Sequence, residues 1–151
     1  MSLIPHYFTV NNPYDPLAVT ANAVTRANHH LWRTLASRVD EQLDSEAVYA
    51  PLVRSTGLSR WIIEKNLFAM ATLDELPRLR ELVEKLHHLD MKRLRAIESA
   101  LALADRQYFP LLDEQITAFL SPTRANQPLP SPKAITRRIR AMVVELDASI
   151  A

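Results

Sequence analysis

The chain has 151 residues, with one glycine, ten prolines and no cysteine. Its length suits one domain, and its 48% hydrophobic and 23% charged residues are typical of a soluble globular protein. The single glycine excludes glycine-rich phosphate loops and dinucleotide fingerprints, which need several glycines, and argues against a sheet built from tight hairpins. The lack of cysteine excludes disulfides, zinc ribbons and cysteine nucleophiles.

The net charge is close to neutral. Eighteen Lys and Arg residues against seventeen Asp and Glu give +1, which is no global signature of nucleic-acid binding. Local basic clusters occur at Arg78/Arg80, Lys92/Arg93/Arg95 and Arg137/Arg138/Arg140. Such clusters are most often solvated helix faces with carboxylate partners.

No segment approaches the roughly 20 apolar residues that span a bilayer. The first residues, Met1 to His6, also lack the basic region and apolar core of a signal peptide. We therefore expect no membrane contact and a cytoplasmic location.

The N-terminal part predicts an extended arm followed by one long helix. Residues 1–14 contain Pro5 and Pro13, and Asp15-Pro16 then has the pattern of an N-cap followed by proline at the first helical position. Without a further proline or glycine, a helix is expected over 16–43, roughly 40 Å long. Its apolar stripe consists of Leu17, Ala21, Val24, Leu31, Leu35, Val39 and Leu43. Such a helix needs cover from other helices or from a second copy of the chain.

Three further helices are expected over the middle of the chain. Ser45 can cap the second, in which Pro51 predicts a kink or a late start. Ser59 is a good N-cap for the third helix. The fourth begins at Asp74 or Leu76, with Pro77 in its first turn.

Three more helices complete the chain. Asp90 caps the fifth, and the sixth opens at Asp105 or Phe109. Residues 121–133 hold four prolines and predict an extended connector. Ser131-Pro132 then begins the last helix. The sequence thus predicts an all-α fold of about seven helices, with residues 15–151 forming a single domain and the connector 121–133 within it.

The five histidines favour structural or surface roles over a metal site. Two adjacent pairs, His29-His30 and His87-His88, cannot easily share one ion, because neighbours on a helix point about 100° apart. Glu84 and His88, four residues apart, could share one, but helical metal sites usually recruit ligands from two or more helices. A helical metalloenzyme therefore rests on these pairs alone, and we expect no cofactor and no bound metal.

No arrangement of residues predicts nucleophilic catalysis, so no catalytic residue is assigned. Asp113 and Glu114 are interpreted as solvated turn or cap residues. The aromatic side chains at helical spacing are interpreted as core residues and not as base-stacking platforms: Trp32, Trp61, Tyr108 and Phe119.

The segment from Tyr49 to Leu67 allows two interpretations. Gly57 stands where a helix-turn-helix would have its turn glycine, and the following helix would present Arg60 and Lys65 to a major groove. In the plainer interpretation, which we favour, Gly57 caps an ordinary helical corner. Glu64 beside phosphates would be unfavourable and counts against DNA reading.

The order of four motifs resembles a known family. These are TGLSRW at 56–61, LDELPRLRELVEKL at 73–86, MKRLRAIESAL at 91–101 and SPTRANQPLPSPKAITRRIRAMVVELD at 121–147. Together they resemble the helical N-terminal domain of an actinobacterial family of unknown function, which typically precedes a C-terminal HNH endonuclease domain. Members usually carry a glycine before the helix that begins here at Asp90, where this chain has His87-His88-Leu89.

The resemblance implies a non-catalytic helical domain that assists a DNA-related activity. The family's nuclease chemistry belongs to the HNH module, and no segment of this chain matches that module, so no catalytic residue is carried over. Contacts to phosphate, if made, are expected from a small set of cations: Arg60, Lys65, Arg137, Arg138 and Arg140. The alternative is a protein-interaction or dimerisation module, which would use the long first helix and make no nucleic-acid contact.

Overall fold

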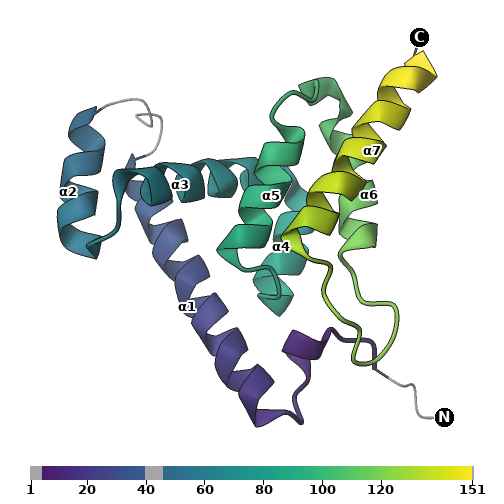
Figure 1. Ribbon diagram of the computed structural model, residues 1–151, viewed down its shortest axis with the longest axis horizontal. Helices are drawn as coiled ribbons and strands as arrows, with labels where there is room; N and C mark the ends of the chain where they lie inside the picture. The colour runs from purple at the N-terminus through teal and green to yellow at the C-terminus, as the bar shows by residue number, and fades with distance from the viewer. Residues whose placement is uncertain (1–4, 40–45, 151) are drawn as a thin grey trace.

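The computed structural model describes residues 5–39 and 46–150, and these confirm the all-α fold (Figure 1). Within these two ranges there are seven α-helices, two 3-10 helices and no strand. The helices are η1 (Thr9–Asn11), α1 (Pro16–Val39), α2 (Glu46–Thr56), α3 (Arg60–Asp74), α4 (Pro77–Leu86), α5 (Met91–Leu101), η2 (Arg106–Tyr108), α6 (Phe109–Phe119) and α7 (Pro132–Ile150).

Four of the predicted helix starts are confirmed by side-chain caps. The carboxylate of Asp15 accepts the N–H of Leu17 at 3.0 Å at the start of α1. The same kind of cap opens three later helices, where a side-chain oxygen accepts a backbone N–H about one turn along. The caps are Ser59 on α3 (3.2 Å), Asp90 on α5 (3.2 Å) and Ser131 on α7 (3.1 Å).

The second helix contains Pro51, for which the sequence predicted a kink or a late start. It starts at Glu46 and continues through Pro51 to Thr56, so the late start is not observed. A proline at this place removes one backbone donor, and the five helical residues before it already form a turn. The predicted cap Ser45, and the end of the predicted first helix at 40–43, lie outside the described residues.

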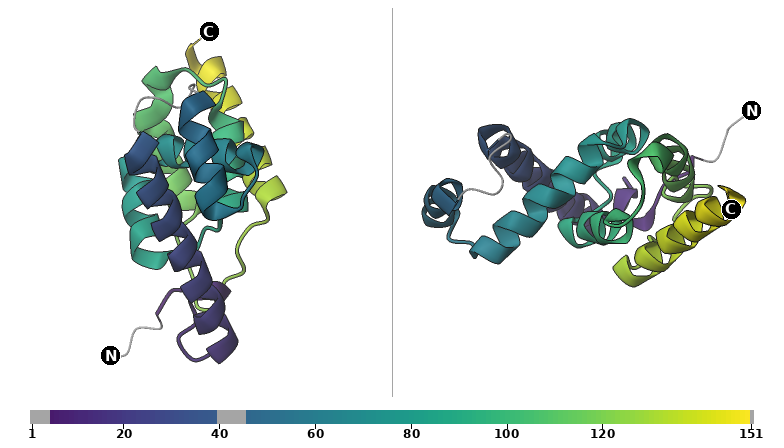
Figure 2. Two further views of the ribbon diagram at one scale, coloured as in Figure 1. Left: turned by 90° about the vertical axis from the view of Figure 1, so that its left-hand side faces the viewer. Right: turned by 90° about the horizontal axis from the view of Figure 1, so that it is seen from above.

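The helices form a bundle with one projecting corner. In Figures 1 and 2, α3 runs from α2 at one end of the molecule to the group of α4, α5, α6 and α7 at the other. Helix α5 is central and packs against both α3 and α7, while α4 packs on α6 and α1 on α3. Among the described residues, no helix combines the length and hydropathy needed to cross a membrane.

Three of the four aromatic predictions hold and one is wrong. Trp32 and Tyr108 are buried and Phe119 is half-buried, but the side chain of Trp61 is 59% exposed. The core side of α3 is set by Ile63, which is fully buried, and by the residues one and two turns after it. Trp61 lies on the opposite side of the helix from Ile63, because two residues correspond to about 200° of rotation.

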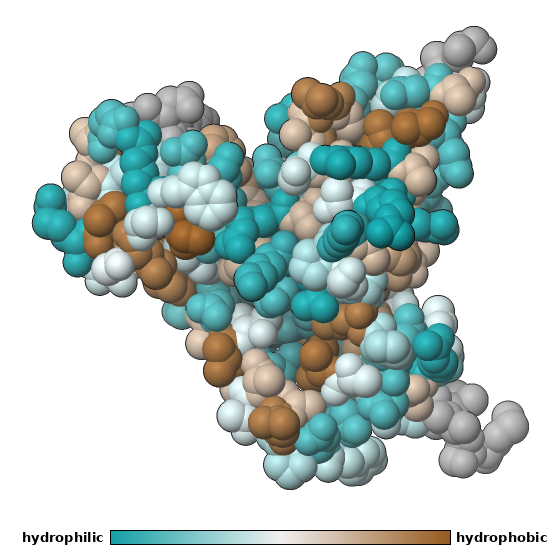
Figure 3. Space-filling model, viewed as in Figure 1, coloured by the Kyte–Doolittle hydropathy of each residue, from teal (hydrophilic) through white to brown (hydrophobic). Residues whose placement is uncertain are grey.

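The apolar stripe of α1 is only half covered. Its C-terminal members Leu35 and Val39 are buried, whereas Leu17 is 78% exposed and Val24 is 59% exposed. Figure 3 shows hydrophobic surface over the part of α1 that runs to the lower end of the molecule. The predicted stripe is therefore present, but its first half lacks cover from the described residues.

The N-terminal arm is docked onto the proline-rich connector. Phe8 is fully buried and forms an isolated parallel bridge with Gln127. The Thr9 N–H donates to the Gln127 carbonyl at 2.8 Å, and the Gln127 N–H donates to the Tyr7 carbonyl at 3.0 Å. Residues 9–11 then form η1, so the arm is extended only up to Phe8 in its described part.

Candidate functional site

The α2–α3 corner has the geometry of a capped helix end. Gly57 adopts φ +70° directly after α2, and its N–H donates to the Val53 carbonyl at 2.9 Å. A left-handed residue with this hydrogen bond is a typical helix C-cap, and glycine takes that conformation without steric cost. The single glycine therefore has a structural role that needs no ligand.

Arg60 is held by partners within its own corner. Its guanidinium makes ion pairs with Glu46 of α2 and, at 3.6 Å, with Glu64 of α3. It also lies over the ring of Tyr49, with 4.8 Å from its central carbon to the ring centroid. A phosphate would have to compete with two carboxylates here, whereas Lys65 on the same helix is exposed.

A line of cations occupies the outer side of α7, and we call it the α7 ridge: Lys133, Arg137 and Arg140. The buried residues of this helix are Ile135, Ile139 and Met142, and helical periodicity places the ridge on the opposite side. All three ridge side chains are exposed. No carboxylate of the described residues forms an ion pair with them. Sequence reasoning did not assign Lys133, although its spacing of four and seven residues from the two arginines gives it the same face.

Arg138 is separate from the ridge. Its guanidinium lies over the ring of Phe119 on α6, with 5.8 Å from its central carbon to the ring centroid. Arg138 and Phe119 both line a groove between α6 and α7. The five cations expected from the sequence thus lie in three places: two on α3, two on the α7 ridge and one, Arg138, against Phe119.

The corner and the ridge lie at opposite ends of the molecule. The start of α3 is next to α2 at one end of the long axis, and α7 is at the other end (Figures 1 and 2). Arg60 and Lys65 therefore do not join the α7 arginines in one continuous basic surface.

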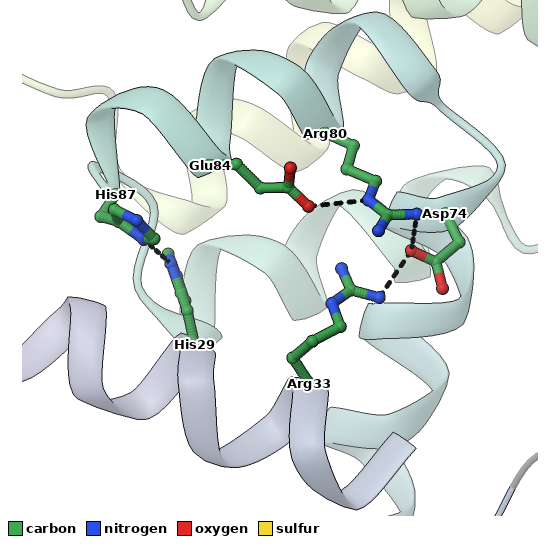
Figure 4. A network of polar contacts seen from close by, with 6 residues as sticks. All are labelled: His29, Arg33, Asp74, Arg80, Glu84 and His87. Atoms are coloured by element: carbon green, nitrogen blue, oxygen red, sulfur yellow. Dashed lines mark hydrogen bonds and ion pairs between the residues drawn. The ribbon is translucent and has the colours of Figure 1, made fainter. Parts of the chain in front are cut away.

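Two histidines far apart in the sequence meet between α1 and α4 (Figure 4). The Nδ1 atoms of His29 and His87 are 2.8 Å apart, and the Nε2 of His29 is 2.6 Å from the Leu89 carbonyl. A carbonyl only accepts, so Nε2 of neutral His29 carries the proton and its Nδ1 accepts from Nδ1–H of His87. This leaves the Nε2 of neutral His87 without a proton. Burial lowers the pKa of both imidazoles, so the neutral forms are favoured.

His87 also makes the tight turn that ends α4. It is the C-cap of α4, in the left-handed region at φ 48°, and its N–H donates to the Val83 carbonyl at 2.7 Å. This conformation is uncommon for a residue with a Cβ.

His88 is a buried structural residue. Its Nε2–H donates to the Leu120 carbonyl at 3.0 Å, and its ring stacks on Phe8 with the centroids 5.2 Å apart. Its Nδ1 is buried without a hydrogen-bond partner among the described residues. Burial lowers the pKa of His88 to about 4.

The ion shared by Glu84 and His88 in the metal hypothesis has no support in this geometry. The Nε2–H of His88 donates to the Leu120 carbonyl just after α6, while Glu84 accepts from the Nε of Arg80 at 2.8 Å. Within residues 5–39 and 46–150, no three His, Asp or Glu side chains are grouped so that they could hold a metal ion.

An ion-pair chain continues along the same side of the molecule as His29 and His87 (Figure 4). The carboxylate of Asp74, the last residue of α3, pairs with Arg33 of α1 at 2.6 Å and with Arg80 of α4 at 3.1 Å. Arg80 also pairs with Glu84, and this hydrogen bond lowers the pKa of the Glu84 carboxyl. The chain ties α1, α3 and α4 together.

Asp113 corrects a prediction, since it is buried and not solvated. Its two carboxylate oxygens accept the N–H groups of Arg78 and Leu79, each at 2.9 Å. It thereby caps the start of α4 from α6, where Leu76 provides no side-chain cap. Sequence reasoning missed this role because the capped helix lies about 35 residues away, beyond any local capping pattern.

No protein-family model matches the chain, and neither the curated proteins nor the solved structures contain a significant match to it.

Proposed function

We propose that this protein is a non-catalytic helical domain that contacts the DNA phosphate backbone through the α7 ridge. The observation that carries the proposal is the line of three exposed cations on one face of α7, without carboxylate partners among the described residues. In keeping with the family resemblance, the domain would assist an HNH-type nuclease activity carried elsewhere. A DNA partner implies a cytoplasmic location.

The charge order along α7 supports this proposal. Residues 132–144 contain four cations and no acidic residue, and Glu145 is the first acid of the helix. Cations near a helix N-terminus oppose the helix macrodipole and slightly destabilise the helix. An external anion on this side would offset that cost.

The length of the ridge fits a nucleic-acid strand. Lys133 and Arg140 are seven residues apart, about 10 Å along the helix axis, which corresponds to about three phosphates of axial rise along one strand. Contacts of this kind position a protein on DNA without reading its sequence. We therefore expect weak dependence on base sequence and strong dependence on salt.

Arg60, Lys65 and Arg138 are left outside the proposed contact. Arg60 is paired with Glu46 and Glu64, and Arg138 lies over Phe119. Lys65 is exposed but belongs to the opposite end of the molecule from the ridge.

Charge reversal of the ridge tests the proposal. In an anisotropy assay with a short labelled duplex at low salt, K133E/R137E/R140E is expected to weaken binding by about a hundredfold, since three phosphate contacts are replaced by repulsion. The matched control R54E/K65E/R78E makes the same change in net charge at exposed sites away from α7. It is expected to weaken binding by less than about fivefold, through the overall field alone. Equal losses in the two variants would remove the proposed interface.

A second candidate function is homodimerisation through the first half of α1. The specific observation is that Leu17 and Val24 continue the stripe of the buried Leu35 and yet are exposed. In this reading a second copy of the chain covers them. Light scattering should then give a dimer mass that L17S/V24S lowers and V144S, at another exposed apolar residue, does not. A monomer mass at all protein concentrations would contradict it.

A further inference from the structure

A pocket of about 280 Å³ lies between α1, α3, α4 and α5. Its floor is apolar and is formed by Met70 and Leu73 of α3, Val83 of α4 and Leu94 of α5. Figure 4 draws four of the residues that line the pocket, His29, Arg33, Glu84 and His87. The His29–His87 contact lies at one end of this group and the Arg33–Asp74–Arg80–Glu84 chain at the other. This volume lies just below the usual range for sites of drug-sized ligands, so it suits a small molecule.

Among the charged side chains in and beside this pocket, cations exceed anions by one. Arg33 and Arg80 are matched by Asp74 and Glu84, with which they form ion pairs. Arg26 of α1 also lines the pocket and has no carboxylate partner among the described residues. With the histidines neutral, these five groups sum to +1, which a single negative charge would balance.

Arg26 acts on His87 through its charge. Burial of the ring is the larger cause that lowers the pKa of His87, the positive charge of Arg26 adds to this effect, and Glu84 opposes it. His30 of α1 also lines the pocket, and the charge of Asp90 at the start of α5 opposes the lowering of the His29 pKa. An anion between Arg26 and His87 would be attracted by Arg26 and would favour the protonated form of His87 that Arg26 disfavours.

The backbone of His87 gives an independent reason to assign it a role. Glycine adopts the left-handed conformation of a helix C-cap at the lowest steric cost, but this C-cap is a histidine at φ 48°. Its Nδ1 is engaged by His29, so its free Nε2 is the atom left for another partner. Strain at such a position is a pointer toward function.

We propose that this pocket binds a small monocarboxylate with a short apolar chain. The chain lies against the floor of Met70, Leu73, Val83 and Leu94, and the carboxylate lies between Arg26 and His87. The guanidinium of Arg26 donates to the carboxylate oxygens. His87 takes up a proton at Nε2 on binding and donates it in a second hydrogen bond, because an unprotonated Nε2 and a carboxylate oxygen are both acceptors.

Hexanoate, with 1-hexanol and acetate as matched probes, tests the assignment by methyl and imidazole NMR on the full chain. Hexanoate is expected to bind with a dissociation constant on the order of 1 mM or below, and to shift the methyl signals of the four floor residues. Hexanol and acetate are each expected to bind about tenfold more weakly, because each lacks one of the two interactions. The affinity for hexanoate should rise as the pH is lowered from about 7.5 to about 6, with proton uptake at His87.

Two variants separate the pocket from general charge effects. R26Q removes the unmatched cation from an exposed position and is expected to bring hexanoate down to the affinity of hexanol. R38Q removes an exposed cation in the last turn of the same helix and is expected to change nothing. Three results would each overturn the proposal: no saturable shift by hexanoate, equal binding of hexanoate and hexanol, or unchanged hexanoate binding in R26Q. DNA affinity enters none of these measurements, so the proposal stands or fails independently of the α7 ridge.

Discussion

At the α2–α3 corner, the guanidinium of Arg60 lies between two carboxylates and over an aromatic ring. On α7, the cations of the ridge point away from the core and no described carboxylate pairs with them. In the sequence the two regions look alike, because each places cations within a few residues of one another on a predicted helix. Their difference teaches that a cation is available to an outside anion only when neighbours within the chain do not already neutralise it.

The comparison leads to a division of effects: changes at the corner should alter stability, and changes on the ridge should alter binding.

The largest expected effect is loss of stability in acid, through His88. Its folded pKa of about 4 lies below the ordinary value of 6.5, so the unfolded chain binds more protons between these values. Stability is therefore complete above about pH 6.5 and falls as the pH is lowered toward about 4, by about 3 kcal/mol. Urea unfolding across this range measures it, and H88Q should flatten the profile while H30Q, at an exposed site, should not. A wild-type stability that does not change with pH would refute the lowered pKa of His88. The DNA-binding measurements on the corner and ridge variants should be made above about pH 6.5, where this loss of stability is absent.

The next effect is at the corner. G57A should lower the free energy of unfolding by about 1 kcal/mol, because alanine is strained at φ +70°. Apart from Gly57 and its two chain neighbours, no described atom lies within 4 Å of the position that the new Cβ would take, so the loss is one of backbone strain alone. Urea unfolding measures it, and S55A on the same helix is the control. DNA affinity should be unchanged, and a parallel loss of affinity would break the division between corner and ridge.

The smallest expected effect comes from one substitution on the ridge, K133E, which should raise the free energy of unfolding and lower the affinity for DNA. K133E places an acid in the first turn of α7 and should stabilise the chain by about 0.5 kcal/mol through the helix dipole. The same change should weaken DNA binding by about fivefold, an equal share of the loss expected for the triple reversal, since attraction at one phosphate becomes repulsion. Unfolding and anisotropy are measured on one sample, with K133Q expected to fall between wild type and K133E in both. If K133E leaves DNA affinity unchanged, Lys133 does not belong to the interface.

Local signals in the sequence predicted most of the fold. Ser59, Asp90 and Ser131 were recognisable as helix starts because a cap and its hydrogen-bonded N–H lie within one turn of each other. The all-α class followed from the same local patterns together with the near absence of glycine. These features depend on residues close in the chain, so a single sequence contains them.

The features that were missed depend on distant partners. Trp61 has a helical spacing to other apolar residues, but its side chain is 59% exposed because no helix of the described residues covers its side of α3. Asp113 caps a helix about 35 residues before it, and His87 meets His29 across 58 residues. The candidate site on α7 was partly predicted, because its arginines are adjacent in the chain, but the engagement of Arg60 by Glu46 needed the fold.

The salt dependence of DNA binding tests the central claim most directly. Each phosphate neutralised by a cation contributes about 0.9 to the slope of log affinity against log salt, so K133Q/R137Q/R140Q should reduce the wild-type slope by about 3. R54Q/K65Q/R78Q removes the same net charge elsewhere and should leave the slope nearly unchanged. A slope that is the same in wild type and in the ridge variant would show that the α7 ridge does not contact phosphate.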